Sequence, residues 1–170
     1  MKRLVGSLAL AGIIITLAAA PANALMPERF QPGPNPDFTV EGVCDFPVLL
    51  HDVVNQGVIT DFFDQDGNLT REQFNGLLIE EVSRLDAQGN PVETITRNIS
   101  GPGVETFDED GSTLTGTGPW LLFFFPGEVT GFPDGVIWFT TGQFVLRLED
   151  TGEITLVKEP MHQDVCELLG

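Results

Sequence analysis

The chain has 170 residues, of which 25 are acidic and eight are basic, and its net charge at neutral pH is −17. A chain of this length predicts a single domain. Because a field of this sign repels phosphate backbones and anionic lipid headgroups, the composition argues against nucleic acid and against a membrane as partners.

The first residues have the pattern of a secretory signal peptide. Lys2 and Arg3 precede an apolar stretch, and a small-residue cleavage signal (Ala-Asn-Ala) follows at residues 22–24. We therefore expect a leader over residues 1–24, a mature chain that starts at Leu25, and secretion into the extracellular space. No later stretch approaches the roughly 20 apolar residues that span a bilayer, so we expect no membrane insertion.

Residues 25–37 contain four prolines and one glycine. Proline removes a backbone donor and is unfavourable in a helix, so this segment predicts an extended arm or a disordered lead-in. The remaining residues, 38–170, are expected to form the folded domain.

Short apolar or alternating stretches follow, separated by turns rich in Gly, Asp and Asn. Pairing is expected to begin at residues 38–40, and the predicted strands that follow cover residues 48–54, 58–64, 76–86, 92–100, 104–107, 120–125, 136–139, 143–150 and 153–159. A tight turn at residues 108–111 leads through residues 113–117 into the run at residues 120–125. A turn is expected at residues 55–57, and another at residues 66–68. Residues 76–86 have helical propensity, but we favour a strand because the stretches on both sides alternate with period two.

This pattern predicts an all-β fold with antiparallel strands. We expect one barrel, or a barrel-like sandwich, of about 8–10 strands. The barrel is favoured because a long meander must protect its edge strands. Residues 161–170 are expected to form a short helix or a tail.

The most apolar part of the domain is the run at residues 120–125, followed by a second run at residues 136–139. Both faces of the first run are apolar, so one face has to meet the core. The other is covered by the arm or tail, buried in a homo-oligomer, or open to a small apolar ligand. For the ligand alternative, the candidate binding residues are Trp120, Phe123, Phe125 and Trp138.

Cys44 and Cys166 are the only cysteines. In an exported chain, two cysteines that bracket the domain are expected to form a disulfide bond. Such a bond would tie the first long strand to the C-terminal tail, and it would leave no free thiol for catalysis.

Four segments resemble a group of small secreted proteins of unknown function from high-GC Gram-positive bacteria. They are GVCDFPV (residues 42–48), NISGPG (98–103), GTGPWLLFFFPG (116–127) and DVCELLG (164–170). The resemblance covers most of the mature chain and includes both cysteines. It implies export and a disulfide-closed β domain, and it supplies no functional residues.

Few residues point to chemistry. His51, beside Asp52 in a predicted strand, is a weak candidate for a general base if it lines a cavity. The acidic turns at residues 61–68 and 108–111 do not place a glycine and ligands where an EF-hand loop needs them, so we expect no metal site. No cofactor motif is found.

Three functions remain open. The first is an exported, non-catalytic binding module for a small apolar ligand. The second is a secreted enzyme for a small or lipid-like substrate, with His51 or an inward-facing acid as the base. The third is an extracellular structural or assembly protein.

Overall fold

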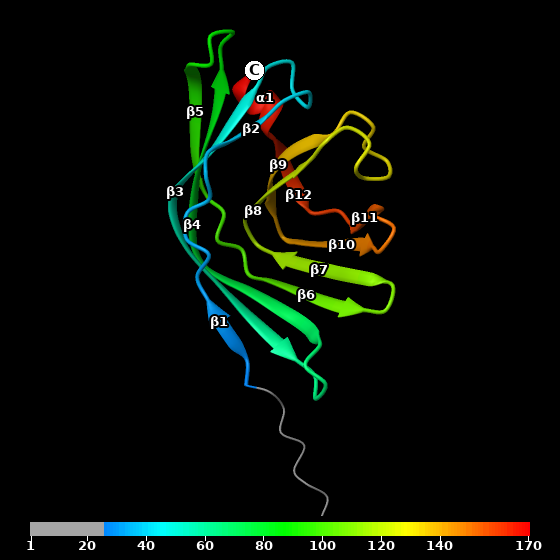
Figure 1. The fold of residues 1–170 in the computed structure, drawn as a ribbon. Helices are drawn as coiled ribbons and strands as arrows, with labels where there is room; N and C mark the ends of the chain where they lie inside the picture. Colours follow the sequence, from blue (N-terminus) through cyan, green and yellow to red (C-terminus); the bar gives the residue numbers. More distant parts are fainter. Residues whose placement is uncertain (1–25) are drawn as a thin grey trace, which may run out of the picture.

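The computed structural model describes residues 26–170, so the predicted signal peptide lies outside the described residues. The described chain is all-β and forms two sheets, followed by one short helix (Figure 1). The large sheet consists of β1 (Glu28–Phe30), β2 (Phe38–Val40), β3 (Val48–Phe63), β4 (Leu69–Leu85), β5 (Pro91–Asn98), β6 (Gly103–Asp108), β7 (Gly111–Thr117), β10 (Gln143–Glu149) and β11 (Ile154–Lys158). The small sheet consists of β8 (Trp120–Phe124), β9 (Val136–Thr141) and β12 (Met161–Asp164), and α1 (Val165–Leu169) ends the chain.

The two long strands β3 and β4 form the hairpin on which the large sheet is built. They pair over almost their whole length, and the predicted turn at residues 66–68 connects them. The turn predicted at residues 55–57 is wrong, because these residues stay in the ladder and β3 continues through them. Residues 76–86 belong to β4, which confirms the preference for a strand over a helix.

A glycine pair lies at the middle of this hairpin. Gly57 and Gly76 are directly opposite each other, and Gly76 has a φ of 124°. A Cβ atom at Gly76 would come within 2.3 Å of the Gln56 carbonyl oxygen, so the close approach of the two strands requires glycine there. On one side of this pair β4 binds β5, and on the other side it binds β6. The large sheet therefore curves from β3–β5 to β7, β10 and β11 (Figure 1).

The small sheet lies inside this curve, and its strands β8 and β9 have buried side chains on both faces, whereas β12 is mostly exposed. Leu121 and Phe123 of β8 pack with the core residues of β3 and β4, such as Leu50 and Val82. Leu122 and Phe124 face the other way and pack with the side chains of β10, such as Phe144. The two-sided apolar pattern of residues 120–125 thus follows from a position between the two halves of the large sheet.

The strands of the described part do not close into a single barrel. The path through the large sheet runs from β1 to β11, and no ladder joins it to the small sheet. The prediction of an antiparallel all-β fold is confirmed, and the arrangement is consistent with the sandwich alternative. Twelve strands are present instead of 8–10, partly because the arm and the tail contribute β1 and β12.

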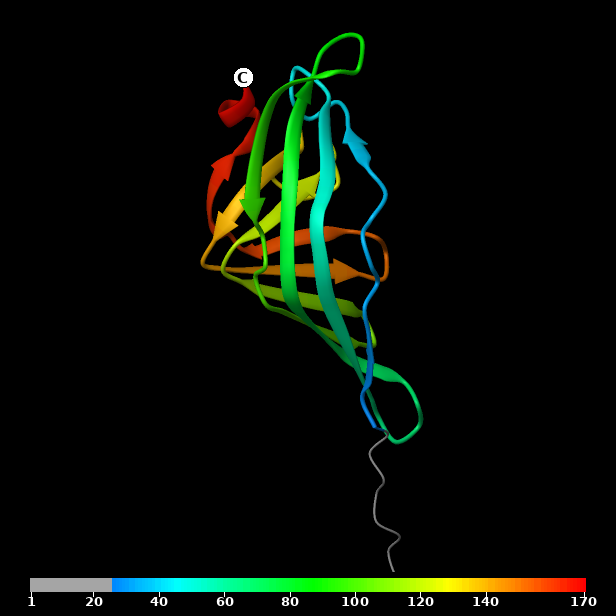
Figure 2. The same ribbon diagram turned by 90° about the vertical axis from the view of Figure 1, so that its left-hand side faces the viewer.

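The proline-rich arm is extended and follows the outer edge of β3 (Figure 2). Within it, β1 pairs with the far end of β3, and β2, which follows the arm, pairs with the near end. Residues 31–37 span the distance between these two pairings. The middle of β3 therefore has the arm beside it.

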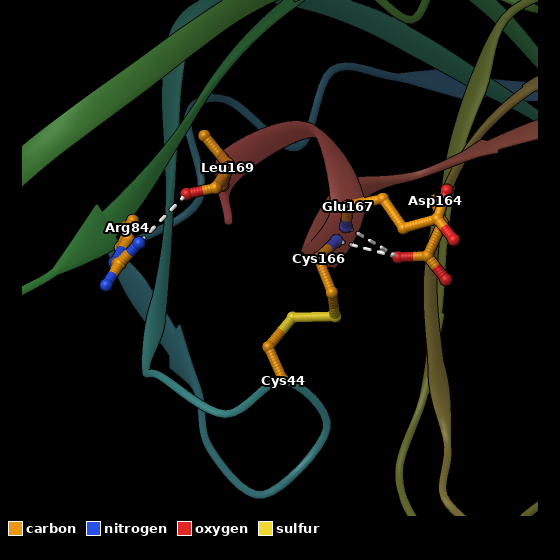
Figure 3. The surroundings of a disulfide bond; sticks show 6 residues. All are labelled: Cys44, Arg84, Asp164, Cys166, Glu167 and Leu169. Carbon is orange, nitrogen blue, oxygen red and sulfur yellow. Dashed lines mark hydrogen bonds between the residues drawn. A yellow bond between two sulfur atoms is a disulfide. The ribbon is translucent and has the colours of Figure 1, made fainter.

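The predicted disulfide bond between Cys44 and Cys166 is present and joins the loop before β3 to α1 (Figure 3). Asp164 caps this helix, since its carboxylate accepts hydrogen bonds from the backbone N–H groups of Cys166 and Glu167. Arg84 of β4 donates to the carbonyl of Leu169 over 3.3 Å. The C-terminal segment is thus fixed to the large sheet by covalent and polar contacts.

Candidate functional site

A cleft with a volume of about 390 Å³ opens between the β3–β4 hairpin, β8 and the arm. Its walls are mostly apolar. They are formed by Pro36, Phe38, Leu50, Leu78, Ile99, Leu121 and Phe123. Three polar residues complete the lining, namely Asn35, Asp52 and Glu80. An apolar cavity with a few convergent polar groups is the usual form of a small-molecule site.

Asp52 and Glu80 meet because they are directly opposite each other on β3 and β4. Opposed residues of an antiparallel pair place their side chains on the same face. Here that face also carries Leu50 and Leu78, so both acids point toward the cleft.

A β-bulge shapes the polar end of the cleft. The register shifts between Asp52 and Val54, and Val53 has no partner in the ladder. In a regular strand Asp52 and Asn55 would point to opposite faces, because side chains alternate. The extra residue brings Asn55 to the same face, where its Nδ2 donates to Asp52 Oδ2 over 2.8 Å.

The arm supplies two further donors to the same oxygen. The backbone N–H and the side-chain Nδ2 of Asn35 lie 2.7 and 3.0 Å from Asp52 Oδ2. Burial alone would raise the pKa of Asp52, but hydrogen bonds from Glu80, Asn35 and Asn55 outweigh it and hold that pKa below its ordinary value. Asp52 is therefore ionised at neutral pH.

Glu80 has the opposite protonation state. Glu80 is only 6% exposed. Burial, then the hydrogen bond to Asp52 and the charges of Asp52 and Asp37, raise the pKa of Glu80 to about 8. At neutral pH the pair thus holds one proton and one negative charge, with Glu80 as the donor to Asp52.

A second cavity of about 280 Å³ adjoins the cleft and shares Asn35, Leu78, Ile99 and Leu121 with it. It extends along the hairpin to Gly57 and Gly76, and Trp120 lies in its wall. The two cavities thus lie next to each other beside the arm.

The predicted ligand-binding residues do not all lie together. Phe123 lines the cleft, and Phe125 packs edge-on against it and against Phe38. Trp120 lines the adjoining cavity. Trp138 lies on the other face of the small sheet, is 3% exposed, and packs between Phe132 and His162.

His51 does not line the cleft. Its side chain is 46% exposed. His51 precedes Asp52 on β3 and is opposite Glu81 on β4, so its side chain lies on the face of the sheet that points away from the cleft. A 2.6 Å hydrogen bond to Asp37 raises the pKa of His51 above its usual range. The structure therefore gives this histidine a partner in the arm and no place at the cavity.

The acidic turns serve the hairpins themselves. The Asp64 carboxylate accepts from the backbone N–H groups of Asp66 and Asn68 and from the Asn68 side chain. Asp86 makes the same contacts with Gln88 and Asn90. No cluster of three or more His, Cys, Asp or Glu side chains suited to a metal ion occurs within residues 26–170.

Asp52 and Glu80 are the site residues that the sequence reasoning missed. Both occupy inward positions of strands whose neighbours on that face are apolar, Leu50 in one case and Leu78 and Val82 in the other. A carboxyl group in an apolar alternation is a signal that sequence alone can give. That Asp52 and Glu80 are opposite each other depends on the register of the β3–β4 hairpin. This register could not be predicted once a turn had been placed at residues 55–57.

Compared with known proteins, the chain matches no family model, no curated protein and no solved structure. In the described residues, none of the helices has the length and apolar character needed to cross a membrane.

Proposed function

We propose that the chain is an exported, non-catalytic binding protein that holds a small apolar ligand in the cleft between the β3–β4 hairpin and β8. The observation that carries this proposal is the cleft itself, which is lined by seven apolar residues and bordered on one side by Asn35 and Pro36 of the arm. A core of packed side chains would leave few voids of this size, because protein interiors are close-packed.

Titration with the neutral apolar dye Nile red tests the proposal. We expect saturable fluorescence enhancement in the folded protein and its loss in Leu121→Trp, because Leu121 borders both cavities and a larger side chain fills them. Val157→Trp is the matched control, since Val157 is 64% exposed on β11. Leu121→Phe serves if the larger residue prevents folding. Equal dye binding by wild type, both Leu121 variants and control would contradict the proposal.

Export and the natural ligand are tested together by native mass spectrometry of the protein taken from the culture medium of its own host. We expect a chain that starts at Leu25 and carries the disulfide bond, with additional mass that disappears on denaturation. A chain found only inside the cells, with residues 1–24 retained, would contradict export.

The acid pair favours one alternative function, a secreted enzyme for a small apolar substrate. A protonated Glu80 beside an ionised Asp52 is the combination that general acid and base catalysis uses. If the molecule released from the native protein is chemically altered on incubation with fresh protein, and is not altered by Glu80→Gln, the enzyme alternative replaces the binding protein.

A further inference from the structure

We propose that the ligand of this cleft is a cationic amphiphile, an apolar molecule with one amine group that lies as ammonium against Asp52 and Glu80. This inference rests on the proposed function and specifies the chemical class of the ligand.

The charged groups of the cleft favour a cationic ligand. Asp52 and Glu80 are the only ionisable residues that line the cleft and its adjoining cavity, and no Lys, Arg or His of the described chain does so. None of the ion pairs within residues 26–170 includes either acid. Beyond the lining, Asp37 acts on Glu80, and His51 is bound to Asp37. Arg97 of β5 is directly opposite Glu80 in the ladder, but its guanidinium group lies over the Phe139 ring, and within residues 26–170 it forms no ion pair with Glu80. The cleft therefore carries a negative charge for which these residues supply no cation.

The hydrogen bonding of Glu80 also favours a ligand that donates hydrogen bonds. Asp52 Oδ2 accepts three hydrogen bonds from Asn35 and Asn55 and has its partners within the protein. Glu80 is buried as a residue and borders the cleft, and within the described residues the hydrogen-bond partner of its carboxyl group is Asp52. A carboxyl group accepts more than one hydrogen bond, so Glu80 keeps acceptor sites that face the cavity. Buried polar groups are normally satisfied, and an ammonium group, which has three donors, satisfies these acceptors.

The remaining walls of the cleft are mostly apolar. Six of the surrounding side chains are aliphatic or aromatic, namely Phe38, Leu50, Leu78, Ile99, Leu121 and Phe123. These six side chains favour the apolar body of a ligand and offer no donor to an anionic head. In the adjoining cavity, the indole N–H of Trp120 is a donor that has no partner within the described residues. The net charge of −17 adds a long-range attraction for cations and a repulsion for anions.

Binding of an ammonium group has a consequence for the proton of Glu80. A positive charge beside the pair favours the ionised carboxylate and lowers its pKa. The protein then loses a fraction of a proton to the buffer when the amine binds. A neutral ligand of the same shape has no such effect.

The test uses three probes with one chain length, octylammonium, 1-octanol and octanoate, in calorimetric titrations below their aggregation concentrations. We expect octylammonium to bind about tenfold more tightly than octanol, since hydrogen bonds to charged groups are the stronger ones. Octanoate should bind more weakly than either. Titrations at pH 7 in two buffers with different ionisation enthalpies should show proton release for octylammonium only.

Variants locate the effect. In Asp52→Asn and Glu80→Gln the difference between octylammonium and octanol should shrink to about twofold or less, and Glu80→Gln should abolish proton release. Glu81→Gln is the matched control, because it makes the same Glu-to-Gln change one position along β4, where the side chain points away from the cleft. This control should keep the preference for the amine. Glu80→Gln alone decides the result if Asp52→Asn does not fold.

The outcomes separate the two proposals. Octanol and octylammonium that bind equally well would overturn the inference and leave the binding protein in place. Tighter binding of octanoate would do the same. If neither octanol nor octylammonium binds, the proposed function fails, and the inference fails with it.

Discussion

At the scale of single residues, Glu80 is the least expected group in the protein. A glutamic acid on an apolar face is costly when ionised, and Glu80 avoids this cost by keeping its proton at neutral pH. Asp52 keeps its charge because donors from β3 and the arm surround one of its oxygens. Two carboxyl groups in one cleft thus have opposite protonation states because their hydrogen-bond partners differ.

The raised pKa of Glu80 predicts a stability that falls with pH. Between the ordinary value of 4.5 and about 8, the folded state holds a proton that the unfolded state has lost. The free energy of unfolding therefore decreases as the pH rises through this window and is constant, for this group, above it. The upper bound of the loss is roughly 4–5 kcal/mol, and we expect about 1–3 kcal/mol because water in the cleft screens the charge.

Urea unfolding of wild type and Glu80→Gln at pH 5 and pH 8 measures this effect. The variant should gain stability relative to wild type at pH 8 and differ little at pH 5. The raised pKa of His51 also makes the free energy of unfolding fall as the pH rises. Since His51 is present in both proteins, the comparison removes its contribution. Glu93→Gln, on the exposed strand β5, is the control for the loss of one charge. An identical pH dependence in wild type and Glu80→Gln would contradict the assigned protonation state.

At the scale of the elements, the glycine pair determines the shape of the long hairpin. Gly57 and Gly76 allow the two strands to approach closely where β4 changes its partner from β5 to β6. Asn55, Gln56 and Gly57 are typical turn residues, so sequence reasoning predicted a turn here. In the structure Gly57 remains in the ladder, and its N–H also lies 3.0 Å from Asn55 Oδ1. Local propensity was thus overridden by pairing with a strand that lies about 20 residues later in the chain.

Gly76→Ala should lower the free energy of unfolding by roughly 1–3 kcal/mol, because the new methyl group requires an unfavourable φ and meets the Gln56 carbonyl. Gly89→Ala is the matched control. Gly89 also has a positive φ, of 81°, but a Cβ atom there has no neighbour within 4 Å. Urea midpoints of the two variants separate the close approach from the backbone conformation. A loss at Gly89 as large as that at Gly76 would show that the strand contact is unimportant.

The strand β8 offers a second comparison within one element. Leu122 is buried against the β10 side of the core, and Leu121, one position before it, borders the cavities. Leu122→Ala should cost about 2–5 kcal/mol, the usual range for a packed leucine. Leu121→Ala should cost clearly less, since part of its surroundings is already empty. Similar losses in chemical denaturation would indicate that the cleft is filled by side chains in solution.

At the scale of the whole molecule, the fold class, most strands and the disulfide bond followed from the sequence. Alternation and turn residues are local, and they predicted the hairpin between β6 and β7 and the strand nature of residues 76–86. The partition into two sheets did not follow, because it depends on which distant strands pair. For the same reason, the sequence did not show that Phe123 and Trp138 occupy opposite faces of the small sheet.

The disulfide bond should contribute substantially to stability. Its cysteines are 122 residues apart, and in the chain-entropy model the closure of such a loop is worth roughly 4–5 kcal/mol, often less in practice. We expect Cys44→Ser/Cys166→Ser to unfold at lower urea concentration than the oxidised wild type. Reduced wild-type protein is the control, and it should resemble the double variant. If oxidation state does not change the midpoint, the bond has no role in equilibrium stability.

The position of the bond in the chain has a further consequence. Cys166 lies in α1, and its partner lies before the first long strand, β3. Because a ribosome adds Cys166 only 122 residues after Cys44, the native bond forms only on chains that have been synthesised through Cys166. A chain cut short before this cysteine retains Cys44 as a free thiol. A thiol-specific reagent therefore distinguishes such chains from those that carry the disulfide bond.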